Sequence, residues 1–375
     1  MAVEIRTVQS KEDLKKFLEF GNELYRHNPY HVPSLIKDDM DTLSPDINPA
    51  FEFCEAIYFL AWRGKQIVGR IAGIINHRAN EAWNNLNARF GFVDFINDNE
   101  VVDALFNAVE EWARSKGMEM LHGPLGFTDM DKEGMLVEGF DQLGTMITLY
   151  NYAYYPKQLE RIGFVKDIDW KEYKIFIPDE VPEKHKRISE IIKKKYGLRV
   201  IHPRSTKEIK PYIQEFFETI NSCYSNLYGY SELSPLQIAY YAKTYVPLLR
   251  PDFVALVERE EDNRLIGVSV ALPSLSKALK KSNGKLAPFG WMYLLSALKG
   301  NPKVVDLLLV AVLPEYQNRG VNALFFDALI PAFKKCGVEY AESNPELETN
   351  MAVQMQWDYF ERVHHKLRRC FIKKL

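Results

Sequence analysis

The sequence predicts an α/β protein of the layered α+β kind, in which one fold occurs twice. Segments with strand character and segments with helix character alternate along the chain, which is typical of sheets covered by helices. The 375 residues suit two domains or one large domain. Three sequence landmarks also occur twice in the same order, which indicates a duplication.

The predicted elements follow the same order in both halves. Each half begins with a strand, continues with helices, and reaches an alternating apolar strand and then an amphipathic helix that ends at a glycine. The first half places these elements at 3–8, 11–25, 64–75 and 101–117, and the second at 198–201, 207–224, 262–272 and 321–337.

The repeated landmarks are not equally spaced, so each half carries an insertion. The helix ends at Gly117 and Gly337 lie 220 residues apart, whereas Gly69 and Gly267, which follow a turn in each half, lie 198 apart. The first half has extra residues after its helix, around GPLGFTDMDKEGMLVEGF, and the second has them before its helix, around SLSKALKKSNGKLAPFGWMYLLSALKG. A charged, proline-flanked segment at 178–197 reads as a connector. We therefore expect two domains, 1–178 and 179–375.

Composition excludes several classes of protein. The net charge of -2 does not favour nucleic acid as a partner. The four cysteines, Cys54, Cys223, Cys336 and Cys370, are scattered and predict reduced thiols, with no metal centre. The first residues lack the apolar core of a signal peptide, and no apolar run approaches ~20 residues. We expect a cytoplasmic protein.

The stretch LPEYQNRGVNALFFDAL, from Leu313 to Leu329, has the pattern of an anion site. An apolar strand ends at a proline, a polar loop with one glycine follows, and an amphipathic helix begins. The N-terminus of a helix offers unpaired N–H groups and a partial positive charge, and glycine lets the backbone approach a phosphate. The candidate residues are Gln317, Asn318, Arg319, Gly320, Val321 and Asn322. The alternative is a plain turn in which Gly320 relieves strain.

The corresponding loop of the first half lacks these features. At the same 220-residue spacing, positions 317–320 correspond to Asn97, Asp98, Asn99 and Glu100. Acids at a helix start stabilise the helix but repel phosphate. We therefore expect the first half to have the fold without the anion site, and to complete the substrate cleft or brace the second half.

The loop resembles that of the GNAT acyltransferases, Gln/Arg-x-x-Gly-x-Gly/Ala, although Asn322 departs from its last position. The segments His122–Asp141 and Tyr154–Phe164 resemble the YghO-like bacterial family of tandem GNAT proteins. The resemblance implies two GNAT domains, each a mixed, mostly antiparallel sheet flanked by helices. It also implies transfer of an acetyl or longer acyl group from acyl-CoA to an amine, a small molecule or a lipid, in the second domain. It does not fix the substrate.

The resemblance also implies roles for particular residues. The thioester would lie along the strand that precedes the loop, beside the backbones of Val310, Ala311 and Val312. Asn350 matches the asparagine of the coenzyme site. Trp357 stands where a tyrosine usually protonates the thiolate. Tyr359, two residues out of register, is either that general acid or a packed aromatic residue.

Candidates for a general base lie at the strand ends. Asp306 and Glu342 could take a proton from the amine directly or through water, or they could be solvated strand-end charges. His364 and His365 are expected in a surface turn. The terminal segment KLRRCFIKKL alternates as an edge strand would, with its basic residues outward.

The two insertions leave alternatives open. The first, with Asp129, Asp131 and Glu133, is either a functional loop or a hairpin covering the sheet. The apolar part of the second, 286–298, could be a core helix, the wall of an acyl-chain tunnel, or a peripheral membrane contact helped by nearby lysines.

Two rival functions also stay open. One is a catalytically degenerate pair that binds acyl-CoA or lipid as a sensor or scaffold. The other is an aminoacyl-tRNA-dependent protein of paired GNAT folds, which would not need the coenzyme loop. The oligomeric state cannot be derived from the sequence.

Overall fold

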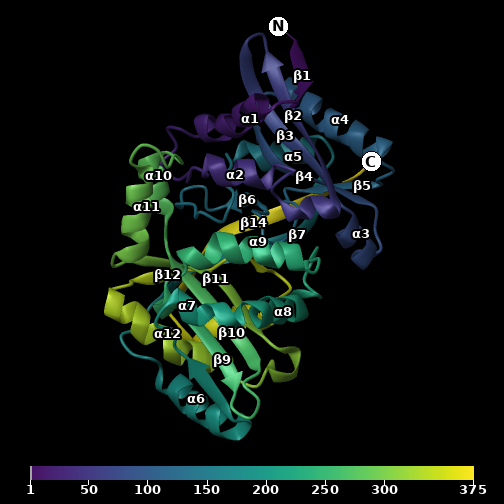
Figure 1. Ribbon diagram of the computed structural model, residues 1–375. Helices are drawn as coiled ribbons and strands as arrows, with labels where there is room; N and C mark the ends of the chain where they lie inside the picture. The colour runs from purple at the N-terminus through teal and green to yellow at the C-terminus, as the bar shows by residue number, and fades with distance from the viewer. Residues whose placement is uncertain (1) are drawn as a thin grey trace.

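A computed structural model describes residues 2–375. Figure 1 shows the first half of the chain stacked on the second, with the C-terminal strand, in yellow, running between them. Helices cover a continuous mixed sheet, so the predicted α/β class with α+β layering is confirmed.

The first half contains the elements that its sequence pattern predicts, together with further strands, three of which follow its long helix. They are β1 (Val3–Thr7), α1 (Lys11–Leu24), α2 (Ile36–Thr42), η1 (Pro49–Glu52), β2 (Cys54–Arg63), β3 (Gln66–Asn76), α3 (His77–Trp83), β4 (Asn87–Phe95), α4 (Asn99–Ser115), β5 (Met120–Gly123), β6 (Met135–Glu138), α5 (Tyr154–Arg161) and β7 (Val165–Phe176).

The second half repeats this order after a connecting helix. Its elements are α6 (Glu183–Tyr196), β8 (Leu198–Ile201), α7 (Thr206–Ile209), η2 (Lys210–Tyr212), α8 (Ile213–Tyr224), α9 (Pro235–Tyr245), η3 (Val246–Leu248), η4 (Pro251–Phe253), β9 (Val254–Arg259), β10 (Leu265–Pro273), α10 (Ser276–Ser282), α11 (Gly290–Lys299), β11 (Val304–Val312), η5 (Pro314–Tyr316), α12 (Asn322–Cys336), β12 (Tyr340–Glu342), β13 (Glu346–Leu347), α13 (Met351–Met355), η6 (Gln356–Tyr359) and β14 (Arg362–Lys374).

The strands join in the order β1-β2-β3-β4-β5-β14-β7-β12-β11-β10-β9-β8. Most neighbours are antiparallel, and the two parallel pairs, β4 with β5 and β11 with β12, occupy the same place in each half. Both parallel pairs follow a strand–helix–strand connection, as parallel pairing requires. The sheet therefore repeats the duplication seen in the sequence.

The two halves exchange their last strands. The last strand of the chain, β14, pairs with β5 of the first half, Phe371 opposite Gly123. The last strand of the first half, β7, pairs with β12 of the second, Ala341 opposite Ile175. The two exchanged strands then pair with each other over most of their length. Each half is thus completed by a strand from the other.

This exchange corrects the expectation of an exposed edge strand at the C-terminus. Lys366 and Arg368 of β14 are almost fully buried, and both pair with the buried carboxylate of Glu172 on β7. Burial alone would raise the pKa of Glu172, but the two cations bring it down to about 2. A buried charge is tolerated only when it is paired in this way. The alternation of the segment is real, but the basic residues Lys366 and Arg368 lie inside the protein rather than outward.

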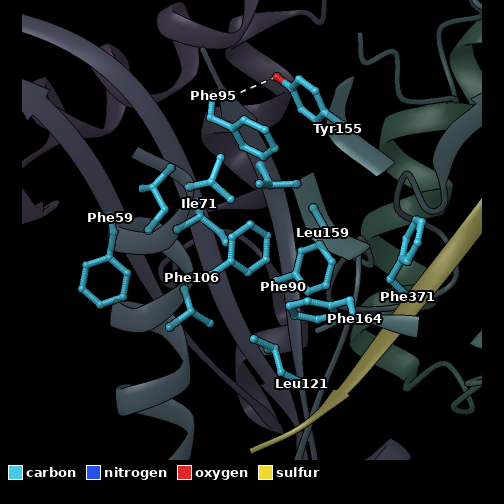
Figure 2. Packing of buried hydrophobic residues seen from close by; sticks show 14 of the residues in the cluster. Phe59, Ile71, Phe90, Phe95, Phe106, Leu121, Tyr155, Leu159, Phe164 and Phe371 are labelled. Carbon is cyan, nitrogen blue, oxygen red and sulfur yellow. Dashed lines mark hydrogen bonds between the residues drawn. The ribbon is translucent and has the colours of Figure 1, made fainter. Parts of the chain in front are cut away.

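Each half has its own hydrophobic core. In the first half α4 packs on the sheet, and Figure 2 shows Phe90, Phe106 and Phe164 packed there edge to face, with Phe371 of β14 in the same cluster. In the second half α12 and α6 pack on one face of the sheet and α8 and α9 on the other. Among residues 2–375, no helix is both long enough and apolar enough to span a bilayer.

Candidate active site

A gap opens between β11 and β12. The two strands pair only from Val304 to Asp306, and β11 then continues to Val312 without a neighbour on that side. The N–H of Leu313 donates to the carbonyl of Ile266 on β10. By the alternation of an antiparallel ladder, the backbone groups of Ala311 face β10 and those of Val310 and Val312 face the gap. The latter two are the backbones that could meet a thioester carbonyl.

Three side chains donate hydrogen bonds to the carbonyl groups at the unpaired edge of β11. The Tyr224 hydroxyl donates to the carbonyl of Val310 at 3.1 Å. The thiol of Cys223 and the amide Nε2 of Gln317 reach the carbonyl of Val312 at 3.0 and 2.9 Å. These donors occupy carbonyl oxygens and leave the N–H groups of the edge to another partner.

A cavity of about 550 Å³ passes through the gap. Its walls include Phe325 and Phe326 of α12 on one face of the sheet, and Phe216 and Tyr241 of α8 and α9 on the other. The first half contributes the loop after β5, so the cavity lies between the halves as well as through the sheet. Its lining is mostly apolar and aromatic, which is typical of a site for a small organic or lipid-like molecule.

The start of α12 beside the gap fits an anion. Asn318 and Gly320 adopt left-handed conformations, with φ of 59° and 83°, and no side chain caps the helix. The guanidinium of Arg319 lies over the rings of Tyr196 and Tyr316, and no acidic side chain within residues 2–375 pairs with it. The N–H groups of Ala323 and Leu324 donate to the carbonyls of Gly320 and Val321. A helix start without a side-chain cap, with a glycine and an unpaired guanidinium beside it, is suited to a phosphate or pyrophosphate.

The matching loop of the first half is closed. Asp98 caps α4 by accepting from the N–H groups of Glu100 and Val101. The carboxylates of Asp98 and Glu100 both pair with Arg63, at 2.9 and 3.0 Å. The helix start is therefore already satisfied and carries negative side chains, as its sequence predicts.

The first half also fills its own gap between β4 and β5. The Tyr155 hydroxyl accepts from the N–H of Phe95 at the end of β4, at 3.0 Å, and its ring stacks on the Phe95 ring at 4.1 Å (Figure 2). The Tyr25 hydroxyl lies 2.7 Å from the same hydroxyl and 2.8 Å from Oδ1 of Asp94, so the three groups share the two hydroxyl protons. The Tyr155 side chain therefore accepts from a backbone N–H at the edge of β4, whereas the equivalent edge of β11 in the second half is not filled in this way.

Three carboxyl groups of the first insertion face the cavity. Burial and the neighbouring Asp131 raise the pKa of Asp129 to about 7, and burial raises the pKa of Asp131 to about 6. Burial raises the pKa of Glu133 well above its usual range. Asp131 is held by the N–H of Thr128, whereas the buried Oδ2 of Asp129 has no hydrogen-bond partner. The sequence placed these acids in an insertion that could be either a functional loop or a covering hairpin, and it did not single them out.

A further acid that sequence reasoning missed lies beside the gap. Glu346 follows β12, lines the cavity and is 8% exposed. Its Oε1 accepts from the indole N–H of Trp357 at 2.6 Å, and its Oε2 has no partner. Burial raises its pKa to about 7. The signal in the sequence was Trp357 itself, because a buried indole N–H requires an acceptor.

The two carboxylates predicted as general bases lie elsewhere. Asp306 and Glu342 face each other across β11 and β12, and both are buried rather than solvated. Burial and the adjacent Glu342 raise the pKa of Asp306 to about 7. Neither residue lines the cavity. His365 is not in a surface turn either, because its ring is buried within β14 with Nε2 2.9 Å from Glu342.

The remaining candidates are divided between the site and the surface. Asn350 lines the cavity and caps α13 through the N–H of Val353. Tyr359 is 52% exposed, and its hydroxyl accepts from Lys184 on α6. It does not line the cavity. The geometry therefore offers no support for Tyr359 as the general acid.

Comparisons with solved structures identify the class of fold. A tandem GNAT protein from the clavulanic acid biosynthesis pathway matches 99% of this chain and 98% of its own, with a TM-score of 0.56 and 13% identity. A GCN5-related N-acetyltransferase from Sphaerobacter thermophilus covers 99% and 95%, with a TM-score of 0.52 and 10% identity. The chain has the tandem GNAT fold. No protein-family model matches it.

Sequence comparison gives relatives that align over nearly the whole chain. Protein YghO of Escherichia coli (strain K12) is 28% identical over 380 aligned positions, covering 99% of this chain and 95% of its own. The bacterial ceramide synthase of Caulobacter vibrioides (strain NA1000 / CB15N) is 26% identical, covering 98% and 96%. The resemblance to YghO-like tandem GNAT proteins is thereby confirmed. Both comparisons thus agree on the tandem GNAT fold over nearly the whole chain.

Proposed function

We propose that the protein is an acyl-CoA-dependent N-acyltransferase that acts on a lipophilic amine at the gap between β11 and β12. The observation that carries the proposal is the cavity, which joins both faces of the sheet at a strand edge with free backbone donors. The uncapped start of α12 lies at the end of the same strand. In the first half the equivalent features are closed by Tyr155 and Asp98.

The second half holds the acyl donor in this proposal. The pyrophosphate of coenzyme A lies against the loop from Gln317 to Asn322, and the thioester carbonyl lies at the edge of β11. The N–H groups of Val310 and Val312 polarise that carbonyl, because donors fixed beforehand stabilise the charge that develops on its oxygen. The apolar walls from α12 accommodate an acyl chain longer than acetyl.

The first half completes the acceptor side in this proposal. Asp129, Asp131 and Glu133 present carboxyl groups to a mostly apolar cavity, which suits an ammonium head on a hydrocarbon chain. One relative is named a ceramide synthase, and a ceramide is the amide of a fatty acid with a long-chain amino alcohol. A long-chain amino alcohol is accordingly the acceptor class that we propose.

The reaction transfers the acyl group directly. The ammonium first loses one proton, and Asp129 accepts it, since its Oδ2 is free and its pKa of about 7 suits transfer near neutral pH. The amine nitrogen then forms a bond to the thioester carbon, and the carbon–sulfur bond breaks. The attacking nitrogen gives up a second proton, and the thiolate gains one to leave as the free thiol of coenzyme A. No covalent acyl-enzyme is required.

The test is an assay of thiol release with acyl-CoAs of graded chain length and sphinganine as the acceptor, with acetyl-CoA and a short amine in parallel. We expect saturable binding of acyl-CoA, and thiol release that depends on the long-chain amine. Amide formation is verified by mass spectrometry of the product.

Two outcomes would overturn the proposal in different ways. If acyl-CoA of no chain length bound saturably, both the proposed enzymatic activity and the proposed coenzyme site would be wrong. Tight binding without turnover across a panel of amines would instead favour a sensor or scaffold.

A further inference from the structure

The second insertion forms a helical hairpin with an unusual charge. It consists of α10, a turn and α11, together with the flanking loops from Ser274 to Lys303. This segment has six lysines and no aspartate or glutamate, although the whole protein is nearly neutral. Lys277, Lys281, Lys285 and Lys299 are exposed, and no acidic side chain within residues 2–375 pairs with them. The hairpin is therefore an isolated positive surface.

The same hairpin exposes a set of large apolar side chains. Phe289, Trp291, Met292 and Leu295 are 64%, 52%, 50% and 40% exposed. Residues four apart on a helix lie on one face, so Trp291, Leu295 and Lys299 form a single outer stripe along α11. Exposed apolar residues that gather on one element mark a contact surface.

The opposite face of α11 is anchored. Leu294 is buried in a small core with Leu275 and Leu279 of α10, which shows that the outer stripe is not a misplaced core face. None of the residues 286–298 lines the cavity. The structure thus gives no support to the acyl-tunnel hypothesis for this segment, and the core-helix hypothesis accounts for the inner face alone.

The hairpin also lies against the wall of the cavity. Lys280 donates to the carbonyls of Asn28 and His31 in the first half. The core of the hairpin includes Val32, and His31 and Val32 both line the cavity. A surface that holds the hairpin would consequently lie close to the site.

We propose that the α10–α11 hairpin docks on the surface of an anionic lipid bilayer. Tryptophan, phenylalanine and leucine enter the headgroup boundary, and lysines attract the anionic headgroups. Positive charge beside an apolar stripe favours a lipid surface over a second copy of this nearly neutral chain. Docking beside the cavity would let a lipid substrate pass from the bilayer to the site, but the docking does not depend on the proposed reaction.

The experiment is co-sedimentation of the full-length protein with vesicles. One set contains equal parts of phosphatidylcholine and phosphatidylglycerol, and the other contains phosphatidylcholine alone. We expect binding to the anionic vesicles that weakens as salt is added. The double variant Trp291→Ser/Leu295→Ser and the double variant Lys285→Gln/Lys299→Gln should each weaken binding on the order of tenfold.

Matched controls separate docking from general stickiness or misfolding. Leu236→Ser and Ile191→Ser remove exposed apolar side chains from α9 and α6, and they should leave vesicle binding unchanged. Equal loss with these controls, equal binding to both vesicle types, or no vesicle binding by the wild-type protein would each overturn the proposal. A dimer in sedimentation velocity that Trp291→Ser/Leu295→Ser dissociates would assign the stripe to self-association instead.

Discussion

The proposed role of Asp129 as the proton acceptor can be tested through the pH dependence of the reaction. Its carboxyl group faces the cavity with one oxygen unpaired, and burial together with Asp131 raises its pKa to about 7. A proton acceptor must be ionised, so the rate of acyl transfer should rise with pH through about 7 and then level off. A carboxyl group that merely supports the loop would not produce this profile.

Replacement of Asp129 by asparagine keeps the shape of the side chain and removes the proton acceptor. We expect turnover to fall on the order of a hundredfold, and the rise with pH through about 7 to disappear. The dissociation constant for acyl-CoA should stay unchanged, because the coenzyme loop lies on the second half. An unaltered pH profile in the Asp129→Asn variant would contradict this role.

Asp306 gives a prediction about stability rather than activity. Burial and Glu342 raise its pKa to about 7 in the folded protein, far above its ordinary value. A group with a raised folded pKa contributes stability at low pH and loses that contribution as the pH rises through the folded pKa. Asp306→Asn removes this loss. Urea unfolding should therefore show the variant gaining stability relative to wild type between pH 5 and pH 8, by about 2 kcal/mol. A difference that does not change with pH would contradict the assignment.

At the scale of elements, the start of α12 differs in structure from the start of its counterpart α4. It follows β11 through the short turn η5 and has no side-chain cap, whereas Asp98 caps the start of α4. The difference lies in a few residues on otherwise equivalent helices.

A pair of glycines allows this element to be tested with a matched control. Gly320 and Gly337 flank α12 with φ of 83° and 75°, so valine at either position brings similar backbone strain. A Cβ at Gly320 also lies 3.1 Å from Ile188 of α6, whereas nothing lies within 4 Å of one at Gly337, so the free energy of unfolding of both variants is measured beside binding. We expect Gly320→Val to weaken coenzyme A binding on the order of tenfold or more in calorimetry, and Gly337→Val to leave it unchanged. Glu100→Gln in the first half should also have no effect. Equal losses in the two glycine variants would indicate a general effect of folding.

The elements were predictable from the sequence because their signals are local. Periodicity and terminal glycines indicated α4 and α12, the repeat indicated the paired halves, and the loop from Gln317 to Gly320 indicated the anion site. The partner of each last strand was not predictable. β7 and β14 have similar patterns, and periodicity does not say which of two equivalent edges a strand will join.

The catalytic side was harder to predict for a related reason. Asp129 and Glu346 come together with the gap only when both halves and the crossed strands are assembled. The sequence correctly placed Asp306 at a strand end. Its side chain is nevertheless buried beside Glu342 and does not face the cavity. Tyr359 is two residues from the position where GNAT proteins usually have a tyrosine, but it lies on the outer surface.

At the scale of the whole molecule, the strand exchange should make the two halves unfold together. Phe371 of β14 is fully buried in the core of the first half, although it is four residues from the C-terminus (Figure 2). Phe371→Ala should lower the free energy of unfolding by roughly 3–5 kcal/mol. Hydrogen exchange should accelerate at core amides of the first half such as Leu121.

A control for this variant lies on the same strand. Lys374 is exposed, and Lys374→Ala should change neither the stability nor the exchange. If Phe371→Ala accelerated exchange in the second half alone, or if wild-type protein unfolded in two separate transitions, the halves would not be coupled in the way that the sheet order implies.

The crossing of the last strands has a consequence for how the protein is made. Synthesis runs from the N-terminus, yet β5 in the first half receives its outer neighbour only from residues 371–374. Until those residues have been made, that strand edge stays unpaired, and an open edge can join other chains. A transcript cut short anywhere in the second half would therefore release a product with an unsatisfied sheet at its centre. The two halves therefore cannot complete their sheets one after the other during synthesis, and both depend on the last strand.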